Sequence, residues 1–195
     1  MGTRRWLAWL VPLIFLGLIF WFAWHRDSDF WRTAANLHQA AREAAARGES
    51  LQALELARKA WVRKPDNSQY GLFLGQLCLE SGRPQTALGV FRRVWSLDNR
   101  ATVALKGQAL ALEQLGDRAG ALIRLAGYLK DHPTDGEMLQ FAAEFASRGA
   151  GDQAAAIGYY QRLYQETKNP QIRRRLLELL VAGERFKEAL PLQEE

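Results

Sequence analysis

The side chains that carry most metal and redox chemistry are few and widely separated in this sequence. Cys78 is the single cysteine, and the three histidines are His25, His38 and His132. One cysteine excludes an intrachain disulfide and a zinc site built on cysteines. Histidines this far apart in sequence give poor support to a metal site. Cys78 falls on the apolar side of an expected helix, which favours packing over reactivity. We therefore expect no metal and no cofactor.

Catalytic motifs are also missing. His25-Arg26-Asp27 matches the first three letters of a kinase catalytic loop, but Arg32 stands where that loop needs asparagine. The glycine-rich phosphate and dinucleotide loops, the zinc-protease helix and the nucleophile elbow are all absent. Glu194-Glu195 lies at the chain end and suggests no acid–base couple. The sequence predicts that the protein is not an enzyme and has no small-molecule substrate.

The composition is that of a folded chain with a mild charge. The sequence has 195 residues, of which 48% are hydrophobic and 24% charged, so disorder is not expected. The net charge is +5, and Arg4 and Arg5 supply two of these charges, which leaves +3 for residues 25–195. A nucleic-acid binder would need a concentrated basic stripe. We expect no nucleic acid among the partners.

An apolar segment near the N-terminus is long enough to cross a bilayer. Residues 6–24 read WLAWLVPLIFLGLIFWFAW, without a charged side chain. A helix of this length spans roughly 28 Å, close to the hydrocarbon thickness, and tryptophans at both ends form the expected interfacial belts. A cleaved signal peptide would have a shorter apolar core and small residues before the cut. A buried core helix would rarely be apolar all round. The sequence predicts a retained single-pass anchor in the lipid bilayer.

The short, basic N-terminal tail favours a cytoplasmic N-terminus. Arg26 and Arg32 lie on the other side of the apolar segment and weaken this signal. We expect residues 25–195 to lie outside the cytoplasm, which in a bacterial inner-membrane protein means the periplasm. The opposite orientation would make the protein a cytosol-facing adaptor.

A 34-residue repeat begins beyond the apolar segment. Ala53, Ala87, Ala121, Ala155 and Ala189 recur at this constant spacing, and Gly48, Gly82, Gly116, Gly151 and Gly183 precede them. Apolar residues recur at spacings of three and four on both sides of each glycine. Such a unit predicts two helices joined by a glycine turn, with a small alanine where the helices approach closely. Pro65 and Pro133 would end the second helix of their units.

This pattern resembles the tetratricopeptide repeat (TPR), which implies an all-α, right-handed solenoid of helix–turn–helix units. In the second unit, Leu74-Gly75, Gly82, Ala87 and Phe91 match the family motif, and Asn99 replaces the closing proline. The predicted boundaries are 1–25 (tail and anchor), 26–33 (linker), 34–67, 68–101, 102–135 and 136–169 (four repeats), and 170–195 (a partial fifth repeat).

The last two units depart from the family pattern. In the fourth, Gly151 comes one residue late and Pro170 falls beyond the expected place, so we expect a lengthened turn. The fifth unit stops before its second helix is complete and has no polar capping helix, which solenoids generally need. We therefore expect this sequence to be the N-terminal part of a longer protein.

The resemblance implies a concave groove lined by the first helix of each unit. The partner-binding residues predicted there are Leu72, Gln76, Leu79, Lys106, Leu110 and Glu113. Other groove positions carry His38, Arg42, Gln69, Val103, Gln140, Glu144 and Arg148. A strip of leucines between the polar ends of the groove suits an amphipathic or extended segment of a partner protein. Lys106 has no matching asparagine pair, so binding of a chaperone C-terminal tail is not expected. A merely solvated groove, or one filled by the rest of the chain, remains the alternative.

Two further surface candidates lie in the C-terminal part of the chain. Arg173-Arg174-Arg175 is the densest basic run, which is either a solvated helix face or a docking patch for an acidic partner. A group of three tyrosines follows on an expected helix, at Tyr159, Tyr160 and Tyr164. We expect at least one ring to pack in the core, and a partner-binding surface is the alternative role for the others.

An anchor followed by such repeats resembles the scaffold proteins of bacterial envelope complexes, including exopolysaccharide exporters. The implied function is a membrane-anchored scaffold that organises subunits of a polysaccharide export, secretion or assembly complex. The alternatives are a cytosol-facing membrane adaptor, or a regulatory front end of an enzyme or pore located beyond residue 195.

Overall fold

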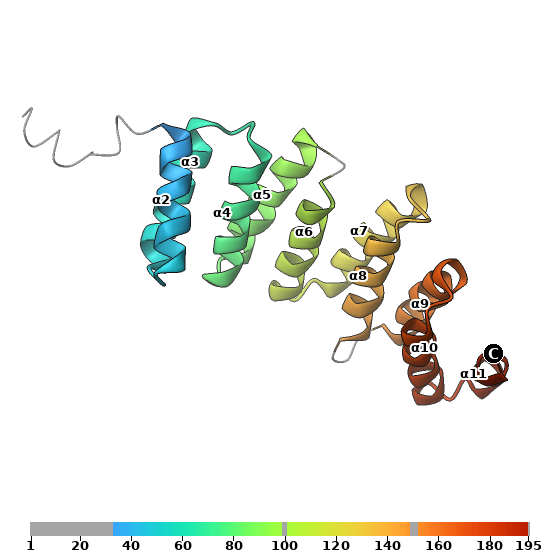
Figure 1. Ribbon diagram of the computed structural model, residues 1–195. Coiled ribbons are helices and arrows are strands. Elements are labelled where there is room, and N and C mark those ends of the chain that lie inside the picture. The colour runs from blue at the N-terminus through green and yellow to red at the C-terminus, as the bar shows by residue number, and fades with distance from the viewer. Residues whose placement is uncertain (1–32, 99–100, 149–151, 195) are drawn as a thin grey trace, which may run out of the picture. The chain divides into compact units, whose positions relative to one another are not determined.

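The computed structural model describes residues 33–98, 101–148 and 152–194, and these ranges form helices joined by short turns (Figure 1). The helices are α2 (Ala34–Ala46), α3 (Ser50–Arg63), α4 (Ser68–Glu80), α5 (Pro84–Leu97), α6 (Thr102–Gln114), α7 (Arg118–Asp131), α8 (Gly136–Ser147), α9 (Gln153–Thr167), α10 (Pro170–Ala182) and α11 (Phe186–Glu194). The even-numbered helices begin at the same position of successive repeats, so the sequence period is a structural period.

The chain divides into two compact units, Met1–Tyr70 and Gly71–Glu195. In the first unit, α3 packs against α2. In the second unit, consecutive helices from α5 to α11 pack against each other. The predicted anchor, residues 6–24, lies outside the described residues. In the part of the chain that the structure describes, no helix is both long and apolar enough to span a membrane.

Glycine makes the turn inside the first three helix pairs, as predicted. Gly48, Gly82 and Gly116 have φ angles of 78°, 66° and 81°, a region that a Cβ atom disfavours. Gly151 lies outside the described residues. The prediction for Gly183 is wrong: its φ is −93°, and the left-handed position passes to Glu184, with a φ of 57°.

Four of the five predicted alanines are buried between helices, whereas Ala155 is half-buried and its neighbour Ala156 takes the buried position. Ala53, Ala87 and Ala121 are fully buried, and Ala189 is nearly so. Cys78 is buried as well, and burial raises the pKa of its thiol above the ordinary value, which confirms the packing interpretation.

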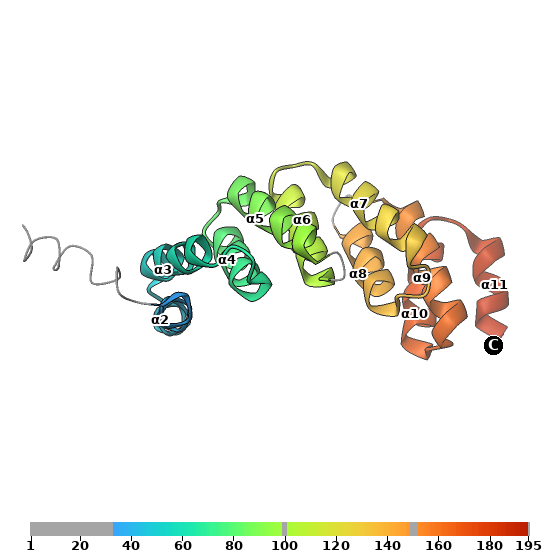
Figure 2. The same cartoon turned by 90° about the horizontal axis from the view of Figure 1, so that it is seen from above.

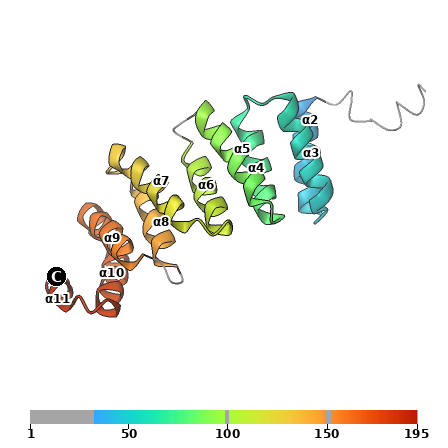
Figure 3. The ribbon, with the colours of Figure 1, turned by 180° about the vertical axis from the view of Figure 1, so that it is seen from behind.

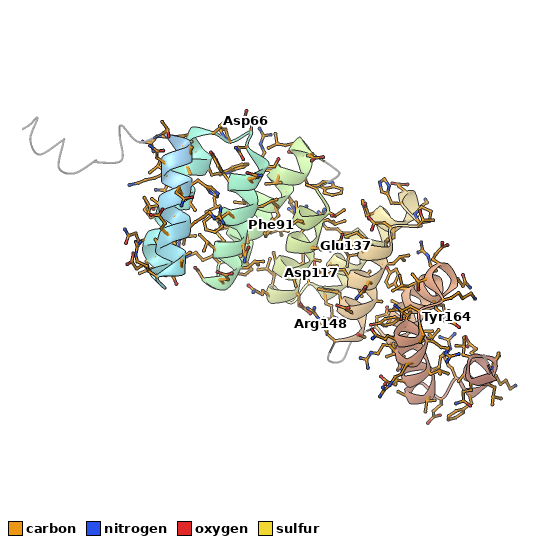
Figure 4. All side chains as sticks on the ribbon, in the orientation of Figure 1. Asp66, Phe91, Asp117, Glu137, Arg148 and Tyr164 are labelled. Atoms are coloured by element: carbon orange, nitrogen blue, oxygen red, sulfur yellow. The ribbon has the colours of Figure 1, made fainter. Side chains whose placement is uncertain are left out.

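Phe91 occupies space that two glycines leave open. A Cβ atom added to Gly75 on α4 would lie 2.6 Å from the Phe91 ring, and one added to Gly107 on α6 would lie 2.5 Å from it. The ring of this α5 residue, labelled in Figure 4, therefore packs directly on both neighbouring first helices. The Gln108 amide, also buried, donates to the Phe91 carbonyl at 3.4 Å.

The fourth helix pair has a longer connection than the others, as predicted. The α8 helix ends at Ser147 and α9 begins at Gln153, whereas α6 ends at Gln114 and α7 begins at Arg118. Pro170 takes the first position of α10, where a missing N–H is tolerated because it would have no partner within the helix. The Asn169 side chain caps this helix by accepting from the Gln171 N–H at 2.8 Å.

Candidate partner-binding face

Within the second unit, the first helices of the pairs gather on one side. Viewed from above, α4, α8 and α10 lie along one side and α5 and α7 along the other (Figure 2). From behind, α5 and α7 come to the front (Figure 3). The Gln114 amide of α6 donates to the Leu79 carbonyl of α4 at 3.4 Å, so the ends of these two helices are neighbours. We call the side formed by α4, α6 and α8 the first-helix face.

The six predicted binding residues lie in matching rows on α4 and α6. Each row has the spacing i, i+4, i+7, which places its members on one side of a helix. The rows are Leu72, Gln76, Leu79 and Lys106, Leu110, Glu113. Gln76 is exposed and the other five are half-buried.

Polar and apolar side chains alternate between the two rows. At equivalent positions of consecutive repeats, Leu72 is followed by Lys106, Gln76 by Leu110, and Leu79 by Glu113. The corresponding row on α8 is polar throughout, with Gln140, Glu144 and Ser147. The three leucines are thus distributed over α4 and α6, and the face becomes polar at α8.

Lys106 bridges two of these helices. Its ammonium lies 2.5 Å from a carboxylate oxygen of Glu137 on α8 and 5.4 Å from the centre of the Phe141 ring. The ion pair and the cation–π contact hold the lysine over α8. Its charge is already balanced within the chain, which disfavours its use as a clamp for a partner's terminal carboxylate.

Glu113 forms a second link between α6 and α8. Its carboxylate accepts a hydrogen bond from Arg118 at the start of α7 and lies 3.8 Å from the Arg148 guanidinium. Arg118 also donates to the Phe145 carbonyl, and its guanidinium lies 4.8 Å from the centre of the Phe145 ring. Glu137 and Arg148 stand near opposite ends of α8 (Figure 4), so the two links fix both ends of this helix.

The start of α8 is held by Asp135 and Tyr128. The Asp135 carboxylate accepts from the Met138 N–H at 3.0 Å and from the Tyr128 hydroxyl at 2.8 Å. Burial raises the pKa of Asp135, but these hydrogen bonds and nearby Lys106 outweigh it and leave the pKa below its usual value. Burial, together with the hydrogen bond to Asp135, raises the pKa of Tyr128 to about 12.

We expect the Tyr128 hydroxyl to ionise at a higher pH than the hydroxyl of an ordinary tyrosine. The pKa of Tyr128 is higher in the folded state than its value of 10.0 in the unfolded chain. The neutral hydroxyl therefore stabilises the folded state fully below pH 10.0, and this stabilisation is lost as the pH rises to about 12. Ultraviolet titration should show a late phenolate transition that disappears in Tyr128→Phe. A transition near pH 10 that is assigned to Tyr128 by this substitution would contradict the hydrogen bond to Asp135.

The sequence-based prediction did not include Glu137, Phe141 and Arg118, although they build the face. Lys106 and Glu137 occupy the fifth position of one repeat and the second position of the next. Opposite charges at these two positions are a signal that could have been read from the sequence. The role of Arg118 depends on its reach to a carbonyl 27 residues away, which no local pattern indicates.

Three of the other predicted groove positions belong to the first unit. His38 stacks on Tyr70, with ring centres 4.6 Å apart, and burial, with nearby Arg42, lowers the pKa of this histidine. Arg42 and Gln69 are exposed.

The basic run on α10 is partly neutralised by its own helix. Arg174 lies 3.3 Å and Arg175 2.9 Å from carboxylate oxygens of Glu178. Both pairs are solvent-exposed, so they add little to stability. Arg173 is half-buried, so the run presents less free positive charge than its sequence suggests.

The tyrosine group on α9 is chiefly a packing element. Tyr160 and Tyr164 are buried in the cluster that joins α9 to α10 and α11, and Tyr159 is half-buried against it. Among the described residues, no three His, Cys, Asp or Glu side chains gather as metal ligands would.

Solved structures show the same fold. A MamA fragment from Desulfovibrio magneticus RS-1 is 18% identical, with a TM-score of 0.58 over 83% of this chain and 95% of its own. TTC0263, a TPR protein of Thermus thermophilus, is 19% identical, with a TM-score of 0.55 over 82% and 88%. YrrB, described as a TPR protein with an unusual peptide-binding site, is 13% identical, with a TM-score of 0.58 over 88% and 87%.

At these identities the comparison establishes the fold and not the function. No family model and no curated protein matches the sequence. The chain has a TPR-like all-α repeat fold.

Proposed function

We propose that this protein is a scaffold that binds a segment of a partner protein on the first-helix face. The observation that carries the proposal is the placement of Leu72, Leu79 and Leu110. These leucines are half-buried on α4 and α6, among polar side chains that are already paired within the chain. Partly exposed apolar side chains on one face, set among polar side chains, suit an interaction site. The peptide-binding site of the similar protein YrrB supports this use of the fold.

The favoured ligand is an amphipathic or extended peptide segment. It would place apolar side chains near the leucines and polar groups near Gln76, Lys106 and Glu113. Because Lys106 and Glu113 have partners of opposite charge, the ligand does not need a strong net charge. The basic run on α10 is a less favoured docking surface because Glu178 balances much of its charge.

The proposal extends to the membrane. Residues 6–24 would anchor the protein in a bacterial inner membrane, with the N-terminus in the cytoplasm and the repeats in the periplasm. Tethering raises the effective concentration of a weak site toward other membrane proteins. The partners would then be subunits of an envelope complex for polysaccharide export, secretion or assembly. Alkaline phosphatase fused after Glu195 should be active in cells, and an inactive fusion of full stability would contradict this orientation.

Photo-crosslinking in membranes tests the binding face. A photoreactive phenylalanine analogue at exposed Gln76 should give a protein adduct, because this side chain stands between Leu72 and Leu79. The same analogue at exposed Gln85 on α5, outside the first-helix face, is the matched control. Equal adducts from both positions, or adducts from Gln85 alone, would place the partner elsewhere.

A further inference from the structure

Charge is divided between the two sides of the second unit. The second helices α5 and α7 carry five basic side chains and one acidic side chain, Asp131. The first helices α4, α6 and α8 carry one basic side chain and four acidic ones. The mild net charge of the whole chain conceals this division. We call the side formed by α5 and α7, which comes to the front in Figure 3, the second-helix face.

Most of the positive charge on this face is not balanced within the described part of the chain. Arg118 is the exception, because it donates to Glu113 and to the Phe145 carbonyl. The other four basic side chains are exposed and form no ion pair among the described residues. We call them the basic cluster: Arg92, Arg93, Arg124 and Lys130. Arg124 donates to the Gln108 amide oxygen at 3.2 Å, but this neutral group does not balance its charge.

The surface between these charges is low. Each of the two helices presents a row with the spacing i, i+4, i+7, so its members lie on one side of the helix. The rows, which are exposed throughout, are Gly89, Arg93, Ser96 on α5 and Ile123, Gly127, Lys130 on α7. A Cβ atom added to Gly89 or Gly127 would meet nothing within 4 Å. Because these two positions carry no side chain, a broad surface can approach the cations of both helices at once.

Apolar side chains accompany the basic cluster. Ile123 is 71% exposed on α7. Trp95 is half-buried near the end of α5, and its ring meets the Tyr128 ring of α7 edge-on, with ring centres 5.9 Å apart. Basic side chains beside exposed apolar and aromatic groups are typical of helices bound at a membrane surface. The phosphates of a nucleic acid would pair with the cations but would leave Ile123 in water.

We propose that the second-helix face binds the surface of an anionic lipid bilayer. The basic cluster meets the headgroup phosphates, and Ile123 enters the boundary between the headgroups and the acyl chains. This contact is additional to the anchor proposed at residues 6–24, and it uses the other side of the unit from the first-helix face. A chain bound in this way keeps its first-helix face in the aqueous phase, where a partner segment can reach it.

Capture by added vesicles tests this contact separately from the anchor. The full chain is held in nanodiscs of neutral phosphatidylcholine and mixed with larger vesicles. Vesicles in which about a third of the lipid is phosphatidylglycerol should capture the chain, and neutral vesicles should not. About 1 M salt should release it, because the Debye length then falls to about 3 Å. Without an anchor the chain would stay outside the nanodiscs but would still be captured, so failure of the anchor and failure of this contact are distinguishable.

Substitutions identify the side chains responsible. Arg92→Gln with Arg93→Gln and Lys130→Gln should weaken capture about a hundredfold, the loss expected for three basic side chains near an anionic surface. The matched control replaces all three arginines of the basic run on α10 with glutamine. It removes the same charge from another surface and should leave capture unchanged.

A fluorophore reports which face meets the lipid. Attached at Ile123→Cys, it should become shielded from an aqueous quencher when anionic vesicles capture the chain. Attached at Gln76→Cys, on the first-helix face, it should stay accessible. The native Cys78 is buried, so it does not take up the label in the folded chain.

Three results would overturn the proposal. The first is equal capture by neutral and anionic vesicles, and the second is capture that the substitutions on α5 and α7 leave unchanged. The third is shielding of position 123 by polyglutamate or DNA but not by anionic vesicles, because the face would then bind an acidic protein or a nucleic acid. Equal shielding of positions 76 and 123 would contradict the assignment of the contact to the second-helix face.

Discussion

Phe91→Ala is expected to lower the free energy of unfolding by about 3–5 kcal/mol, the usual range for removing a buried phenylalanine. Phe91 is almost completely buried, and its ring fills the space above Gly75 and Gly107 on both neighbouring first helices. Neither glycine has a side chain that could fill the resulting cavity. Urea unfolding of the full chain in detergent, followed by circular dichroism, measures the change.

Substitutions at glycine make this prediction specific to the ring contact. Gly107→Ala should destabilise the protein when Phe91 is present, because the new methyl group lies 2.5 Å from the ring. In the Phe91→Ala background the same change should stabilise it by up to about 1 kcal/mol, since alanine is the better helix former. Gly89→Ala on α5, where nothing lies within 4 Å, should be stabilising in both backgrounds. A cost for Gly107→Ala that does not depend on Phe91 would contradict the packing described here.

The helix–turn–helix organisation could be predicted from the sequence because local rules determine it. The constant repeat period, the turn glycines and the buried alanines report backbone geometry and close packing, which depend little on distant residues. The exception is Gly183, which does not adopt the left-handed conformation; Glu184 adopts it instead. The repeat spacing alone cannot resolve a shift of one residue within a turn.

The candidate site could be predicted only in part. Helical spacing and the TPR resemblance located the rows on α4 and α6. The ion pair of Lys106 with Glu137 and the contacts of Arg118 with Phe145 join residues that lie on different helix pairs. Such contacts depend on how consecutive helix pairs pack, and this packing is a tertiary property. The pairing of Arg174 and Arg175 with Glu178 follows helical spacings of three and four, and could have been anticipated.

Leu72→Ser combined with Leu110→Ser is expected to weaken partner binding more than tenfold. Truncation of an apolar residue at the centre of an interface typically costs about 2 kcal/mol or more, and tenfold corresponds to about 1.4 kcal/mol. Both leucines are half-buried in the free chain, so part of each side chain is available to a ligand. Helical content should stay intact, because neither residue belongs to the buried core.

Two control variants separate the face from other surfaces. Leu51→Ser with Ile123→Ser removes exposed apolar side chains from α3 and α7, outside the first-helix face. Arg173→Ser with Arg174→Ser removes charge from the basic run on α10. Both should leave partner binding unchanged, as judged by the yield of the adduct formed from position 76.

The most direct measurement is recovery of that adduct from membranes that contain the full chain with native or substituted leucines. We expect Leu72→Ser with Leu110→Ser to lower the yield more than tenfold, while the substitutions on α3, α7 and α10 do not lower it. A yield that survives loss of the leucines but disappears with Arg173→Ser and Arg174→Ser would contradict binding on the first-helix face, and would show that an acidic partner docks on α10 instead.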